Sequence, residues 1–124
     1  MPKVLVDCGN CGPDFNAIRQ MASSQFNATV LRTHGVGDTL KVLKERNVDL
    51  VMVNRKLDRD YSDGLEVVKQ IKADPDVGSV PVMLVTNYEE HQLAAIDSGC
   101  ERGFGKLAIG DAGTKELLEP FLGE

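Results

Sequence analysis

The stretch Val48–Asn54, with the sequence VDLVMVN, constrains the fold of this chain more than any other. It is a short, nearly unbroken apolar run, rich in valine and bounded by polar residues, and it is too short for an ordinary helix. This pattern is typical of a strand buried on both faces, as in a parallel sheet covered by helices. In an open α/β sheet, ligands bind at the carboxyl ends of the strands. Asn54, which closes the run, therefore occupies the position best placed for chemistry, and its side chain can only form hydrogen bonds there.

The rest of the chain alternates short β-branched runs with apolar residues at helical spacing. The predicted strands cover 3–7, 28–32, 48–54, 80–86 and, as a weak fifth strand, 101–104. The predicted helices cover 13–25, a segment capped by Asp38, 63–73, a segment from Asn87 to Gly99, and a segment after Asp111. We expect Asn87 and Glu90 to cap the fourth helix reciprocally. Its core-facing residues are predicted to be Leu93, Ala94 and Ile96.

Strands that alternate with helices at this spacing form βαβ units with right-handed crossovers. Five such units predict a three-layer α/β/α sandwich, a doubly wound, flavodoxin-like α/β fold around a five-stranded parallel sheet. The chain has 124 residues, of which 42% are hydrophobic and 27% charged. These values fit a single domain over residues 1–124 with one core.

Charge and composition exclude several classes of function. The net charge of −5, without any cluster of basic residues, argues against nucleic-acid binding. No apolar run approaches the roughly 20 residues of a membrane span, and no signal-peptide pattern follows Met1, so we expect a cytoplasmic protein without membrane contact. Three cysteines in a chain with enough apolar residues for a core do not make a disulfide framework.

Five motifs follow one another in an order that carries a family resemblance. They are the strand ending in acid at 4–7, the run at 49–53 before Asn54, the helix start at 63–66, the 80–82 segment leading to Thr86, and the 98–100 segment leading to Lys106. In this order they resemble the receiver domain of bacterial two-component response regulators, of the chemotaxis-receiver type, over essentially the whole chain.

The resemblance implies a phosphoryl-transfer site that this sequence keeps only in part. In the family, an acidic pair after the first strand binds magnesium, and an aspartate closing the third strand accepts the phosphoryl group. A threonine or serine and a lysine contact the phosphoryl oxygens. The sequence keeps Thr86 and Lys106, whose joint placement predicts a pocket shared with Asn54. There we expect Lys106 to donate to the Asn54 carbonyl oxygen.

The acidic pair of the family is reduced in this sequence. It becomes Asp7 with Cys8 beside it, or Cys8 and Gly9 if the strands align without a gap from Lys3. One carboxylate and a carbonyl group make a weak magnesium site, because a hard cation prefers several oxygen ligands. We therefore expect no resident cofactor, and only weak magnesium binding near Asp7.

Further departures affect the switch. The residue after Thr86 is Asn87 rather than a small residue, and Leu107 stands where the family usually has proline. The family has an aromatic switch residue three places before its lysine. In this sequence that position is Gly103, with Phe104 one place away. Together these departures predict a pseudo-receiver, a non-enzymatic domain that keeps the fold and lacks the phosphorylation switch.

Such a domain would act by protein–protein interaction in a two-component or related pathway, with a regulatory protein or a second copy of itself as partner. The resemblance places the partner face on the fourth helix, the fifth strand and the fifth helix. On this chain that face includes Glu89, Glu90, His91, Arg102, Lys115 and Glu116.

Two alternatives remain open from the sequence. Cys8 and Cys11 form a C-x-x-C element between a strand and a helix start, where the helix dipole lowers a thiol pKa and favours redox chemistry or metal binding. A closed zinc site needs about four ligands, and the other cysteine and the histidines are not spaced to supply them. Asp58 and Asp60, in the loop after Asn54, are candidate substitute phosphoacceptors.

Overall fold

The structure is a computed structural model that describes residues 2–123. Its strands are β1 (Lys3–Cys8), β2 (Ala28–Thr33), β3 (Leu50–Asn54) and β4 (Val82–Val85). Its helices are α1 (Gly12–Gln25), α2 (Val36–Glu45), α3 (Gly64–Ala73), α4 (Glu89–Asp97) and α5 (Ala112–Leu122), with a 3₁₀ turn, η1 (Lys106–Ala108). Most bounds agree with the predicted ones to within two residues.

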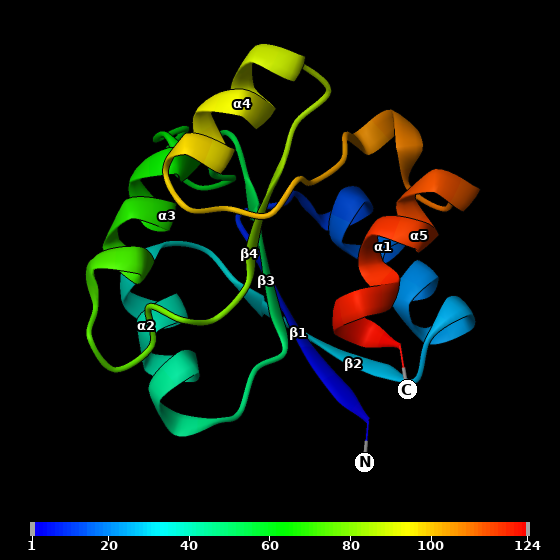
Figure 1. Cartoon of the computed structure of the whole chain (residues 1–124), viewed down its shortest axis with the longest axis horizontal. Helices are drawn as coiled ribbons and strands as arrows, with labels where there is room; N and C mark the ends of the chain where they lie inside the picture. The colour runs from blue at the N-terminus through cyan, green and yellow to red at the C-terminus, as the bar shows by residue number, and fades with distance from the viewer. Residues whose placement is uncertain (1, 124) are drawn as a thin grey trace.

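The strands form one parallel sheet in the order β2-β1-β3-β4. Figure 1 shows α1 and α5 on one side of this sheet and α2 and α3 on the other, so the predicted three-layer sandwich is confirmed. Every residue of β3 is buried, as the apolar run predicts for a strand covered on both faces. Its side chains alternate between two cores, with Met52 on the α1 and α5 side and Val53 on the α2 and α3 side.

The predicted fifth strand does not form in the described part of the chain, and the sheet there has four strands. Glu101 makes a single bridge to Met83. Two residues further on, the backbone of Gly103 lies so close to β4 that a Cβ atom there would overlap the Leu84 carbonyl oxygen. The backbones are joined on either side of Gly103, where the Glu101 N–H donates to the Val82 carbonyl oxygen at 2.9 Å and the Thr86 N–H donates to the Phe104 carbonyl oxygen at 3.0 Å. Between these two bonds, the Gln92 side chain from α4 connects the segments. Its Nε2 donates to the Leu84 carbonyl oxygen at 3.0 Å and its Oε1 accepts from the Gly103 N–H at 2.9 Å.

The predicted orientation of α4 is wrong. Leu93 and Ile96 are exposed by 54% and 38%, and Ala94 is also exposed. The residues that α4 buries are Gln92 and Ala95. The cause is the position of α4 beside the edge strand β4. The Gln92 amide must face β4 to bind the Leu84 carbonyl oxygen and the Gly103 N–H. Leu93 and Ile96 then lie on the exposed side of the helix.

Two predicted helix caps also differ. Tyr88 is the N-cap of α4 without a side-chain cap bond, and Asn87 Oδ1 instead accepts from the Leu107 N–H at 3.2 Å. Asp38 lies inside the first turn of α2, where its carboxylate accepts from the N–H groups of His34 and Gly35. Among the described residues, no helix combines the length and the apolar character that crossing a bilayer requires.

Candidate functional site

A pocket of about 220 Å³ opens at the carboxyl edge of the sheet, where β3 and β4 end. Its lining residues are Asn54, Arg55, Lys56, Val85, Thr86, Asn87, Tyr88 and Lys106. The pocket thus brings together Asn54, Thr86 and Lys106, which the sequence places at the ends of three segments far apart in the chain. Asp7 and Cys8 are not among its lining residues.

Asn54 lies at the end of β3 as a hydrogen-bond donor to its own loop. Its side-chain Nδ2 donates to the Lys56 carbonyl oxygen at 2.6 Å and to the Gly9 carbonyl oxygen at 3.4 Å. A carboxylate has no proton to offer and would face these carbonyl oxygens unfavourably. The loop after β3 is therefore built around an amide at this position.

Lys106 does not bond to Asn54, contrary to the expectation from the sequence. Its Nζ lies 2.7 Å from Asp14 Oδ2 in the first turn of α1, and the same oxygen accepts from Cys11 Sγ at 3.1 Å. Partial burial raises the pKa of Asp14, but the bonds from Lys106 and Cys11 outweigh it, and that pKa lies below its usual value. The Lys106 ammonium is thus neutralised by a residue that the sequence pattern did not single out.

Thr86 is buried, and its hydroxyl group contacts the start of α4. Its Oγ1 lies 3.1 Å from His91 Nδ1 and accepts from the Tyr88 N–H at 3.3 Å. The next residue, Asn87, binds the Leu107 N–H, and its side chain occupies the space beside Gly105. These contacts join the loops before α4 and α5 across the pocket.

Asp7 does not line the pocket, and its position in β1, two residues after Leu5, places its side chain on the α1 and α5 side of the sheet. Its side chain and that of Asn10 are fully buried, and Asn10 Nδ2 donates to Asp7 Oδ1 at 2.5 Å. Asp7 Oδ2 and Asn10 Oδ1 have no hydrogen-bond partner among the described residues. Burial raises the pKa of Asp7 to about 6, opposed by the Asn10 bond and by Arg32. A proton on Asp7 supplies the donor that the two unpartnered oxygens lack.

The alternative register of the acidic pair places it at Cys8 and Gly9, and neither position offers a carboxylate. Gly9 has a φ of +80°, and a Cβ atom there would lie 2.5 Å from Leu57 Cδ2. Leu57 is buried, so the loop after β3 fills the space that an acidic side chain would need. Cys8 points to the opposite core, with Sγ 3.9 Å from the Gly35 carbonyl oxygen.

These residues do not fit a magnesium ion. Asp7 is bonded to an amide inside the core, and Leu57 covers Gly9. Within residues 2–123, no group of three or more histidine, cysteine, aspartate or glutamate residues is arranged to hold a metal ion. A hard cation requires several oxygen ligands, which this edge of the sheet does not present together.

The C-x-x-C element is divided between two environments. Cys8 is buried inside β1, and burial raises the pKa of its thiol. Cys11 is exposed at the N-cap of α1, and neither thiol forms a disulfide. A buried thiol of raised pKa forms little of the reactive thiolate, which argues against the redox alternative.

The two loop aspartates differ from each other. Asp60 is exposed and closes a local turn by accepting from the N–H and Oγ of Ser62. Asp58 is largely buried, with His34 Nδ1 at 3.0 Å and an Arg32 guanidinium nitrogen at 3.6 Å from its Oδ2. This cluster fastens the loop to the end of β2. No spacing in the sequence could have revealed it, because its members come from separate segments.

The switch position holds no movable ring. Gly103 is buried against β4 and has no room for a side chain. The Phe104 ring is packed in the core shared by α1 and α5.

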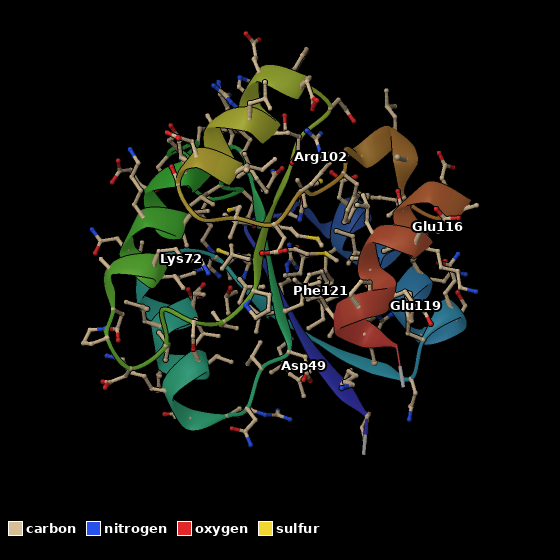
Figure 2. All side chains as sticks on the ribbon, viewed as in Figure 1. Asp49, Lys72, Arg102, Glu116, Glu119 and Phe121 are labelled. Atoms are coloured by element: carbon tan, nitrogen blue, oxygen red, sulfur yellow. The ribbon has the colours of Figure 1, made fainter. Side chains whose placement is uncertain are left out.

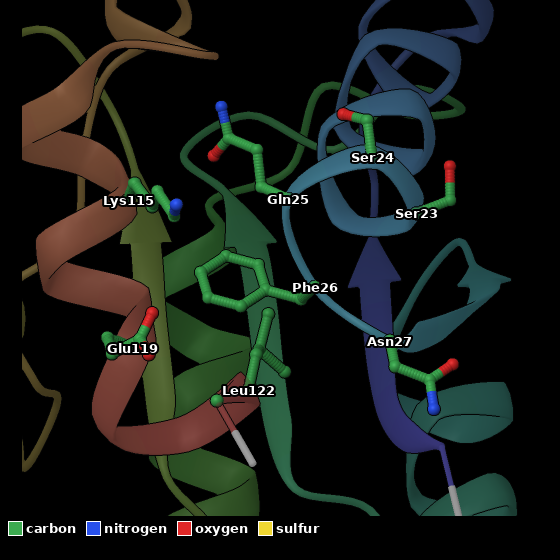
Figure 3. Close-up of a pocket in the computed structure, with 9 residues that line it drawn as sticks. Ser23, Ser24, Gln25, Phe26, Asn27, Lys115, Glu119 and Leu122 are labelled. Carbon is green, nitrogen blue, oxygen red and sulfur yellow. The ribbon is translucent and has the colours of Figure 1, made fainter.

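The predicted partner face is divided by α5. Arg102 forms an exposed ion pair with Glu89 of α4, and Figure 2 shows Arg102 between α4 and α5, with Glu116 on α5 itself. Lys115 instead lines a cavity of about 500 Å³ between α5 and the end of α1. Figure 3 shows Lys115 and Gln25 projecting from the two sides of this cavity above the Phe26 ring. Lys115 thus belongs to a different surface from Arg102.

Comparison with known proteins identifies the fold. No family model matches the sequence, and no curated protein does. Among solved structures, a putative response regulator from Chloroflexus aurantiacus superposes with a TM-score of 0.85 at 13% identity, over 100% of both chains. The signal receiver domain of a DNA-binding response regulator from Colwellia psychrerythraea has a TM-score of 0.80 at 16% identity, over 98% of this chain and 99% of that one.

A third similar structure carries a metal. It is the receiver domain of a sensor histidine kinase from Pseudomonas aeruginosa, with magnesium coordinated in its active-site cleft, and it has a TM-score of 0.75 at 13% identity over 100% of both chains. These likenesses confirm the receiver fold. The residues of this chain, rather than the likeness, must decide its chemistry.

Proposed function

We propose that this chain is a pseudo-receiver, a non-enzymatic signalling domain of the cytoplasm that works by protein binding and without phosphorylation. The observation that carries the proposal is the Asn54 amide, which occupies the acceptor position and donates to the Lys56 and Gly9 carbonyl oxygens. The receiver fold of the similar structures supports a role in two-component or related signalling.

Three independent features oppose phosphoryl transfer. An aspartyl phosphate needs a carboxylate nucleophile, a cation to neutralise the incoming oxygens, and a free ammonium group. Asn54 supplies an amide, Leu57 fills the space of an acidic ligand, and Lys106 is paired with Asp14. Asn54 and Leu57 belong to the end of β3 and the loop after it, whereas the Lys106–Asp14 pair joins two other segments. Changing Asn54 alone therefore leaves the Lys106–Asp14 pair in place.

The partner face that we propose lies on α4 and the adjoining 101–105 segment. Leu93 and Ile96 of α4 are exposed beside the Glu89–Arg102 ion pair and Glu90. Apolar side chains gathered on an exposed helix and bordered by charges are typical of a protein-binding surface. The partner is a regulatory protein or a second copy of this chain.

This face is held in one conformation. Gln92 connects α4 to β4 and to Gly103, and Asn87 connects the loop before α4 to Leu107. With no aromatic ring at Gly103, the family's switch has no side chain to move. We therefore propose that binding is constitutive.

A capture experiment tests the proposed face. The chain is immobilised with either Arg102→Glu or Lys115→Glu, and each is compared with the unmodified chain for capture of its strongest native partner. We expect Arg102→Glu to weaken capture and Lys115→Glu, the same charge reversal on the other side of α5, to leave it unchanged. The Arg102 and Lys115 side chains are both exposed, so the melting temperature should change little.

Equal loss with both variants would indicate a general charge effect and contradict the proposed face. Leu93→Glu provides a second test, because it places a charge in the exposed apolar row without disturbing the core. Capture that survives both Arg102→Glu and Leu93→Glu would show that the partner binds elsewhere.

A further inference from the structure

The Asn54 pocket is basic in an acidic protein. Three of its eight lining residues are Arg55, Lys56 and Lys106, and none is an aspartate or a glutamate. The chain as a whole has 19 acidic and 14 basic residues. A concave site lined by one sign of charge concentrates ligands of the opposite sign.

Two of the three cations are unpaired. The Lys106 ammonium is neutralised by Asp14. Arg55 and Lys56 form no ion pair within residues 2–123, although Asp63 shares a small neighbouring cavity with Arg55. The pocket therefore retains positive charge that the folded chain does not neutralise.

The rim of this pocket is apolar and accessible. Tyr88, which lines it, is 63% exposed, and Leu107, which follows Lys106, is 86% exposed. The Asn87 side chain ties Leu107 to the lining through its backbone N–H. A small pocket bordered by exposed apolar side chains is how protein interfaces accommodate a single anchoring residue.

We propose that the Asn54 pocket binds the carboxylate side chain of an acidic residue on a partner protein, while neighbouring apolar residues of that partner contact Tyr88 and Leu107. Its volume of about 220 Å³ lies below the roughly 300–1,000 Å³ of small-molecule sites, but it suits one side chain. The Arg55 guanidinium is suited to a carboxylate because it can donate two parallel hydrogen bonds. The inference rests on the proposed function, since a phosphorylated pocket would already hold its anion.

The test uses a capped tripeptide, leucine-glutamate-leucine, with leucine-glutamine-leucine as its neutral counterpart and inorganic phosphate as a free anion. Binding is followed by NMR through the side-chain amide signals of Asn54 and Asn87, which line the pocket. We expect saturable shifts with the glutamate peptide and at least about tenfold weaker binding of the glutamine peptide, the effect of losing charge-assisted hydrogen bonds.

Variants of the loop after β3 assign the binding. Arg55→Gln and Lys56→Gln should each weaken the binding of the glutamate peptide. Arg59 is an exposed residue of the same loop that does not line the pocket, so Arg59→Gln should leave the binding unchanged. Lys56 is exposed, so its variant remains informative if Arg55→Gln fails to fold. Equal binding of both peptides, equal loss with Arg59→Gln, or binding of phosphate alone would overturn the proposal.

The two proposals fail in different ways. If the glutamate peptide does not bind and the protein accepts no phosphoryl group, the carboxylate site is wrong and the pseudo-receiver remains. If an aspartate becomes phosphorylated, the proposed function fails whatever the peptides do.

Discussion

Replacing Asp7 by asparagine should stabilise the protein at neutral pH. The Asp7 carboxyl group is buried with Asn10, and burial raises its pKa from 3.8 to about 6. Its ionised form is therefore disfavoured in the folded state relative to the unfolded chain. Asp7→Asn removes the buried charge and provides an N–H donor for the unpartnered Asn10 Oδ1.

The size and sign of the effect follow from the raised pKa. Below about pH 4 the carboxyl group is protonated in both states, and it imposes no cost. As the pH rises from about 4 to about 6 the unfolded chain loses the proton first, so the free energy of unfolding falls. Above about pH 6 the loss is complete. A shift from 3.8 to about 6 corresponds to about 3 kcal/mol.

Urea denaturation at several pH values measures this difference. Asp7→Asn should be more stable than the unmodified chain by up to about 3 kcal/mol at pH 8, and the difference should shrink as the pH falls from about 6 to about 4. Asp76→Asn, at an exposed site, is the control and should show no such change. An Asp7→Asn variant less stable than the unmodified chain at pH 8, or a stability difference independent of pH, would show that the buried Asp7 carboxylate does not destabilise the fold.

Three further predictions concern other parts of the fold. Asn54→Asp should lower the free energy of unfolding by about 1–3 kcal/mol in urea denaturation, because its carboxylate would face the Lys56 carbonyl oxygen without a donor. Gly103→Ala should lower the free energy of unfolding by about 1–3 kcal/mol, because the added methyl group overlaps β4. Gly113 has open space around it, so Gly113→Ala should not lower the stability. Equal melting temperatures of the two variants would contradict this prediction. A thiol reagent should modify Cys11 alone in the folded protein, since Cys8 and Cys100 are buried; rapid reaction of a second thiol would contradict the burial of one of these two cysteines.

The sequence predicted the layers of the fold well. The unbroken apolar run of β3 identifies a strand buried on both faces, and the capping signal at Asp63 places the start of α3 correctly. Local patterns of this kind depend on neighbouring residues, which the sequence displays directly.

The errors at the edge of the sheet have a common physical cause. The periodicity of α4 alone predicts that its apolar residues face the core. In the structure Gln92 faces β4 instead, because its amide binds the Leu84 carbonyl oxygen and the Gly103 N–H. The Gln92 amide also interrupts the pairing of the 101–104 segment with β4, because it binds the Leu84 carbonyl oxygen and the Gly103 N–H. An amide that satisfies backbone groups of a distant strand leaves no periodic signal.

The sequence predicted three members of the candidate pocket, but not Asp7 and Cys8, which lie outside it, and not the bonds between side chains. The family pattern placed Asn54, Thr86 and Lys106 at one pocket, where the structure has them. It could not indicate that Lys106 pairs with Asp14, because side chains far apart in the chain choose partners by geometry. The sequence also could not decide which residues of β1 and its loop correspond to the acidic pair of the family. The structure shows that Asp7 is fully buried.

The central claim, that the Asn54 pocket does not accept a phosphoryl group, is tested most directly by intact-mass measurement. The chain and its Asn54→Asp variant are incubated with a small phosphodonor and magnesium. We predict an unchanged mass for the chain, and no efficient labelling of the variant, because Leu57 still fills the space beside Gly9 and Lys106 still pairs with Asp14. An acid-stable, base-labile phosphoryl adduct on an aspartate of the unmodified chain would contradict it.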